Sequence, residues 1–143
     1  MRFPDILDAL SKQLNIEITD EGGASAVEID GLNVILNLAD SDLLLIHADL
    51  GEIPPDLREK VAAAALEANF LYQGTGGATL AVNPFDGHLH LQKYNWLERL
   101  DPDKVLNTLS RFADTALTWR KIISDAIAAP AEPTPFATDF IHA

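Results

Sequence analysis

The pattern of apolar and polar positions changes its period several times along the chain. Near the N-terminus, five apolar residues recur at helical spacing: Phe3, Ile6, Leu7, Leu10 and Leu14. Pro4 suits the first turn of a helix. The spacing therefore predicts a helix from about Pro4 to Leu14 with one apolar face.

Beyond Asp20–Gly23 the period becomes two, which is typical of strands. Asp30-Gly31 offers a tight hairpin turn between the first two strands, and residues 39–42 offer a second turn. A third strand, Leu43 to about Leu50, follows it. We therefore expect an antiparallel meander. The third strand is apolar at almost every position, so we expect both of its faces to be covered.

A second helix is expected to open at Pro54–Asp56, because proline and an acid suit a helix start. Its alanine-rich stretch has high helix propensity or lies against a close partner. The glycines of residues 74–77 are expected to end this helix as a C-cap. A hairpin is then predicted from two arms, Ala78–Asn83 and His88–Tyr94, around a turn of proline and glycine.

The last helix is predicted to be capped near Asp101 and to run to about Ala128. Its apolar stripe alternates in steps of four and three: Val105, Leu109, Phe112, Ala116, Trp119 and Ile123. The order α-β-β-β-α-β-β-α predicts an α+β fold, an antiparallel sheet packed against helices. We expect one domain over residues 1–128, followed by a proline-containing flexible tail over residues 129–143.

Composition narrows the possible partners. The formal charge of −12 leaves no basic stripe for nucleic acid and disfavours an anionic membrane surface. The longest aliphatic run, Leu43–Ile46, is too short to span a membrane. Cysteine is absent, and the first residues carry acids where a signal peptide needs an apolar run. A soluble cytoplasmic protein without membrane insertion is therefore predicted.

Candidate chemistry gathers in residues 74–90 but does not form a catalytic pattern. Phosphate-binding loops place their glycines after a strand and before a helix, and here the order is reversed. His88 and His90 share one strand face and could supply two metal ligands, with His47 as a third if its strand lies nearby. Polar positions on a half-buried strand explain them more simply. We predict no metal, no cofactor and no enzymatic activity.

Two sets of residues form a recognisable pattern. In the hairpin they are Leu80, Asn83, Pro84, Gly87, Leu89 and Leu91, and in the last helix they are Phe112, Trp119 and Arg120. This pattern resembles the class I type III secretion chaperones, the Tir chaperone family. The resemblance covers about Pro4 to Ala128.

The resemblance implies a cytoplasmic homodimer that binds the N-terminal region of a secreted effector as an extended segment, keeping it soluble and competent for secretion. The alternative is the same fold serving as a regulatory or sensory interaction module without a secreted client. The predicted effector-binding residues are Ile6, Leu7, Leu10, Leu14, Val34, Leu36, Leu43 and Leu45. The predicted dimer interface comprises Val61, Ala64, Ala65, Ala68, Leu80 and Val82.

Overall fold

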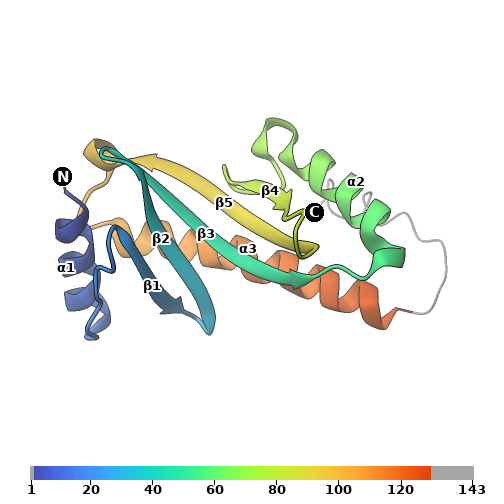
Figure 1. The fold of residues 1–143 in the computed structure, drawn as a ribbon, viewed down its shortest axis with the longest axis horizontal. Helices are drawn as coiled ribbons and strands as arrows, with labels where there is room; N and C mark the ends of the chain where they lie inside the picture. The colour runs from blue at the N-terminus through green and yellow to red at the C-terminus, as the bar shows by residue number, and fades with distance from the viewer. Residues whose placement is uncertain (1, 130–143) are drawn as a thin grey trace. The chain divides into compact units, whose positions relative to one another are not determined.

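The structure is a computed structural model that describes residues 2–129. Within these residues the elements follow the order α-β-β-β-α-β-β-α, with three short 3₁₀ segments between them (Figure 1). The predicted order and the α+β class are confirmed. The bounds are Phe3–Leu14 (α1), Ala24–Ile29 (β1), Leu32–Asp40 (β2), Leu43–Glu52 (β3), Arg58–Asn69 (α2), Thr79–Val82 (β4), His88–Trp96 (β5) and Val105–Ala128 (α3).

The five strands form one sheet in the order β1-β2-β3-β5-β4. Antiparallel pairing joins β1 to β2, β2 to β3, and β4 to β5, which confirms the predicted meander and the second hairpin. β1 and β4 end this order. Each therefore has one side that no other strand of the described chain covers.

Packing contacts divide the chain into two units, and each is described by itself. The first contains α1, β1, β2, β3 as far as Ala48, and the stretch Lys93–Asp114. The apolar face predicted for α1 is buried in it. The core of this unit consists of Phe3, Ile6, Leu7, Leu10, Val27, Ile29, Leu32, Val34, Leu36, Leu44, Ile46, Ala48, Leu97, Val105, Leu109, Phe112 and Ala113.

The turn between β1 and β2 shows why the first hairpin was predictable. Asp30 and Gly31 both adopt positive φ, at 52° and 80°. A two-residue turn with both central residues in this region matches the right-handed twist of the strands that it joins. Asp-Gly supplies that conformation at low steric cost, so the sequence and the local structure agree.

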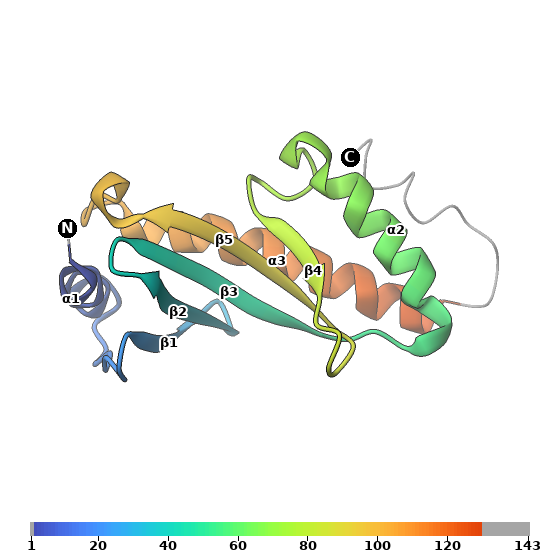
Figure 2. The same ribbon diagram turned by 45° about the horizontal axis from the view of Figure 1, so that its top comes forward.

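The second unit contains Asp49–Gln92 and the part of α3 from Thr115 onward. Figures 1 and 2 show α2 lying along β4. The small alanines of α2 permit this close packing. The core of this unit consists of Leu50, Ile53, Val61, Ala64, Ala65, Ala68, Ala78, Leu80, Leu89, Leu91, Ala116, Trp119 and Ile123.

The end of α2 differs from the prediction that glycine caps it. The helix ends at Asn69, and the residues that turn the chain with positive φ are Leu71 (53°) and Tyr72 (58°). Gly74 serves another purpose, because a Cβ there would lie 2.7 Å from the Cβ of Ala68. The glycine thus permits a close approach, and Trp119 Nε1 donates to its carbonyl at 3.0 Å.

Two helix starts also lie later than predicted. Pro55–Leu57 form a 3₁₀ turn before α2, and α3 begins at Val105, after a turn near Asp101. Both turns contain a proline, and in the second one Asp101 Oδ1 accepts from the backbone N of Asp103 at 3.0 Å. The division into a domain over residues 1–128 and a tail over residues 129–143 stays a prediction, and residues 130–143 lie outside the described residues.

Candidate protein-binding surfaces

One face of the sheet in the first unit carries apolar side chains that remain partly accessible. On β3, Leu44 and Ile46 are buried, whereas Leu43 and Leu45 between them are only half-buried. Alternate residues of a strand point to opposite faces. The expectation that both faces of β3 are covered is therefore met only in part in this unit, because the face of Leu43 and Leu45 stays partly accessible.

Two aromatic residues extend this open face onto β5. Leu97 N donates to the carbonyl of Asp42 at 2.9 Å, which places Trp96 opposite Leu43 and Tyr94 opposite Leu45. Tyr94 is 56% exposed and Trp96 is 47% exposed. Aromatic side chains with this accessibility are enriched where proteins bind partners. We define the open sheet face as Ile35, Leu43, Leu45, Tyr94 and Trp96.

The eight predicted effector-binding residues fall into two groups. Five of them, Ile6, Leu7, Leu10, Val34 and Leu36, are buried in the core of the first unit. The other three, Leu14, Leu43 and Leu45, are half-buried. A partner can touch the second group directly, while the first group supports the surface from beneath. The complete set stays a prediction.

The sequence reasoning missed Ile35, Tyr94 and Trp96. The alternation of Asn95 and Leu97 with the two aromatic residues was the available signal, since it continues the period of two beyond Tyr94. Periodicity separates the two faces of a strand, but it does not show which face the rest of the unit covers. Exposure depends on packing against other elements.

The predicted dimer residues also lie mostly inside the second unit. Val61, Ala64, Ala65, Ala68 and Leu80 are buried, and Val82 is half-buried. They remain a prediction for the dimer interface. The exposed large apolar residues near them in the sequence are Leu66, Phe70, Leu71 and Tyr72. We call these four residues the α2 corner.

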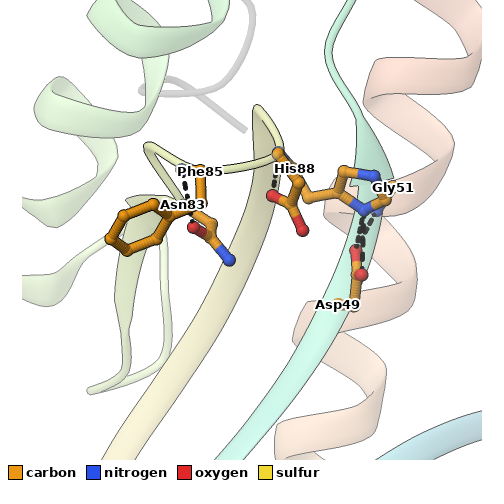
Figure 3. A network of polar contacts seen from close by, with 6 residues as sticks. Asp49, Gly51, Asn83, Phe85 and His88 are labelled. Carbon is orange, nitrogen blue, oxygen red and sulfur yellow. Dashed lines mark hydrogen bonds and ion pairs between the residues drawn. The ribbon is translucent and has the colours of Figure 1, made fainter.

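His88 pairs with Asp49, at distances of 2.8 and 2.9 Å from its Nδ1 to the two carboxylate oxygens (Figure 3). The hydrogen bond from His88 Nδ1 to Asp49 raises the pKa of His88 above 6.5 against the opposing effect of desolvation. Burial acts to raise the pKa of Asp49, but bonds from Gly51 and His88 outweigh it and hold that pKa below 3.8. His88 therefore works as an ion-pair partner.

This pair predicts a pH dependence with a defined sign. Both charges are present between pH 3.8 and 6.5, so the stabilisation is complete there and declines as pH rises through the raised pKa of His88. It also declines as pH falls through the lowered pKa of Asp49. In an NMR titration, His88 should titrate above 6.5 in the parent chain and return toward 6.5 in Asp49→Asn. Equal midpoints would contradict the pairing.

The two histidines considered as metal ligands do not converge with a third group. His47 hydrogen-bonds Asn37 at 3.2 Å in the first unit, while His88 pairs with Asp49 in the second. Within residues 2–129, no three side chains of His, Asp or Glu are grouped so that they could hold a metal ion. None of the helices in that range is both long enough and apolar enough to cross a membrane.

The sequence of the chain identifies its family. The sequence profile of the Tir chaperone protein (CesT) family matches residues 5–120. The chain belongs to this family. No curated protein matches the sequence closely enough to add a relative. The resemblance seen in the hairpin and the last helix is thus confirmed.

Several solved structures share the fold at low sequence identity. A chain of the HopA1–SchA chaperone–effector complex is 20% identical, with a TM-score of 0.64, covering 86% of this chain and 93% of that one. A chain of the Yersinia pestis secretion chaperone SycH bound to a YscM2 fragment is 23% identical (TM-score 0.59; 79% and 95% covered). A chain of the Pseudomonas aeruginosa ExoU–SpcU heterodimeric complex is 18% identical (TM-score 0.63; 82% and 93% covered).

Proposed function

We propose that this member of the Tir chaperone family binds the N-terminal region of a type III secreted effector and keeps it soluble and competent for secretion. The observation that carries the proposal is the open sheet face, where Leu43 and Leu45 lie opposite Trp96 and Tyr94. Family membership supports the same function. The structural neighbours include chaperone–effector complexes, which fits a binding role.

An extended client suits the sheet for two physical reasons. Main-chain hydrogen bonds at a strand edge supply affinity for any extended segment, and apolar patches select its side chains. β1 is an edge strand, and the open sheet face belongs to the same unit. An apolar segment of a client would thereby be shielded from water while it stays unfolded.

The proposal includes a cytoplasmic location and a binding activity without catalysis. The family is a chaperone family, which supports binding over catalysis. The charge of −12 supports solubility while apolar patches are open, because like-charged molecules repel one another.

We also propose a homodimer that forms through the α2 corner. Leu66, Phe70 and Leu71 are 72%, 68% and 69% exposed. Leu71 and Tyr72 both have positive φ, a conformation that costs roughly 1–2 kcal/mol for a residue other than glycine. The backbone thus holds large apolar side chains in solvent at a conformational cost. A second copy that buries them would recover the lost hydrophobic free energy.

Phe70→Asp should convert the dimer to a monomer, because it places a charge in the proposed apolar interface. Size-exclusion chromatography with light scattering measures this directly. Phe85→Asp is the matched control, since Phe85 is 96% exposed in the β4–β5 turn and lies outside the α2 corner. We expect this control to stay dimeric. A monomeric parent chain, or a dimeric Phe70→Asp, would rule out the corner as the interface.

Native co-purification tests the chaperone function. The full chain, tagged and expressed in its own host, should retain a secreted protein in stoichiometric amount. That client's N-terminal segment should then remain soluble only when co-expressed with the chain. If the captured proteins are not secreted, the regulatory or sensory alternative replaces the chaperone function.

A further inference from the structure

The backbone of β4 presents a regular set of groups to the outer edge of the sheet. β4 pairs with β5 through Thr79↔Gln92 and Ala81↔His90, and Asn83 N donates to the carbonyl of His88 at 2.8 Å. In an antiparallel pair, alternate residues direct their N–H and C=O toward the partner strand. Residues 79, 81 and 83 thus bond to β5, while the backbone groups of Leu80 and Val82 face outward.

The side chain of Asn69 occupies the outward groups of Leu80. Its Oδ1 accepts from Leu80 N at 2.9 Å, and its Nδ2 donates to Leu80 O at 3.0 Å. One amide side chain therefore reproduces both hydrogen bonds that a residue of an added strand would make. Ala78 N already donates to Thr75 O at 3.2 Å. Val82 alone of these residues keeps both outward groups available within the described chain.

The position of Asn69 is fixed by the packing at the end of α2. Ala68 lies against Gly74, whose N–H donates to the Ala68 carbonyl at 3.0 Å. The indole of Trp119 donates to the carbonyl of Gly74 in turn. Because this packing orders the backbone next to Asn69, less conformational entropy remains to be lost when its side chain bonds Leu80. A peptide strand would have to displace two formed hydrogen bonds to gain two similar ones.

Within the described residues, the edge of β1 in the first unit is occupied at its start, where Glu21 N donates to the carbonyl of Ala24 at 2.8 Å. Leu38 N donates to Gly23 O, and the pairs Ser25↔Leu36 and Val27↔Val34 continue that pattern. The outward groups are then those of Ala26 and Glu28, whose side chains are exposed. No other strand of the described chain pairs with that side of β1.

We propose that Asn69 is a specificity-determining residue that closes the β4 edge to strand addition and so leaves the β1 edge to accept an extended peptide. The closure of β4 stands on hydrogen-bond geometry alone, and the assignment of β1 as the accepting edge rests on the proposed function. An open β4 edge would also pair with the β4 edge of another copy, which natural sheets commonly prevent.

Hydrogen exchange measured by NMR on the full chain tests the closure of β4. The Leu80 amide should be protected although it faces outward, and Asn69→Ala should accelerate its exchange about tenfold. Asn69→Asp is the intermediate case, because one carboxylate oxygen still accepts from Leu80 N while the other lies against the Leu80 carbonyl that Nδ2 bonds in the parent chain. We expect its exchange rate at Leu80 to fall between those of the parent chain and Asn69→Ala. Unchanged exchange at Leu80 in Asn69→Ala would overturn the proposal.

A measurement of self-association distinguishes closure of the β4 edge by Asn69 from a purely structural role of this residue. Asn69→Ala should form larger species in light scattering, and adding Val82→Pro should abolish them. Proline removes the outward N–H of Val82 without taking a bond from β5. Association that persists in the double variant, or no association in Asn69→Ala, would contradict edge closure.

Variants at β1 test the accepting edge. Glu28→Pro removes an outward N–H and should weaken binding of the N-terminal segment of the client at least tenfold, whereas Glu28→Ala, which changes the exposed side chain but keeps that N–H, should not. Circular dichroism confirms that each variant is folded. If Glu28→Pro binds normally, β1 is not the accepting edge, although the chaperone function stands. If the parent chain binds no client, the proposed function fails while the hydrogen-exchange result remains valid.

Discussion

Trp119→Ala is expected to lower the free energy of unfolding by about 3–5 kcal/mol, because it leaves a large cavity in the second unit. Trp119 is only 2% exposed. Its loss also leaves the carbonyl of Gly74 without the indole donor, at the close contact between Gly74 and Ala68. Urea denaturation followed by far-UV circular dichroism measures the change without depending on tryptophan fluorescence.

The second tryptophan of the chain provides the control. Trp96 is 47% exposed on the open sheet face, so Trp96→Ala should cost less than about 1 kcal/mol. Trp119→Phe should fall between the two, since it keeps most of the ring packing and removes the hydrogen bond to Gly74. Equal losses for Trp96→Ala and Trp119→Ala would contradict the packing described for the second unit.

The elements predicted from the sequence agree with the structure where a local pattern determines them. The helical spacing from Phe3 to Leu14 reproduces α1 to within one residue, and Asp30-Gly31 makes the expected turn. The end of α2 could not be predicted in this way. The helix ends where Phe70 becomes extended, with ψ 116°, and the side chain of Asn69 bonds Leu80, eleven residues away; no local rule for helix ends contains that partner.

The residues of the candidate surfaces could be predicted only in part from the sequence. Alternation on β2 and β3 separates two faces, and the sequence reasoning selected residues from both, such as Leu36 and Leu45. The structure buries Leu36 completely and leaves Leu45 half-buried. That difference comes from the elements packed against one face, and the pattern of a single strand does not reveal which face they cover.

The same reasoning explains the outcome for the alanine-rich helix. The small side chains of this helix favour either high helix propensity or a close contact, and the structure shows a close contact within the protomer, against β4. The exposed apolar residues of this region lie one turn earlier and just beyond the helix end, at Leu66 and Phe70. They do not follow the apolar stripe of the helix. Phe70 directly precedes the turn in which Leu71 and Tyr72 adopt positive φ.

Leu45→Asp is expected to weaken the complex with the N-terminal segment of the client by about 10- to 100-fold. Burying a leucine side chain contributes about 1.5–3 kcal/mol, and the carboxylate would remain unpaired in the interface. Leu45 pairs with Asn37 on the open sheet face, opposite Tyr94, so the fold of the first unit should tolerate the change. Isothermal titration calorimetry with the co-purified client measures the affinity.

The neighbouring residue, Leu44, provides the control for Leu45→Asp. Leu44 points to the core and is completely buried, so Leu44→Asp should unfold the first unit, while Leu45→Asp should keep the unfolding midpoint of the parent. Leu36→Asp would fail as a binding test for the same reason. Tyr94→Asp should reproduce the effect of Leu45→Asp, because the two side chains lie opposite each other. A folded Leu45→Asp variant with parental affinity would exclude the open sheet face as the client surface, and binding would then depend on strand edges alone.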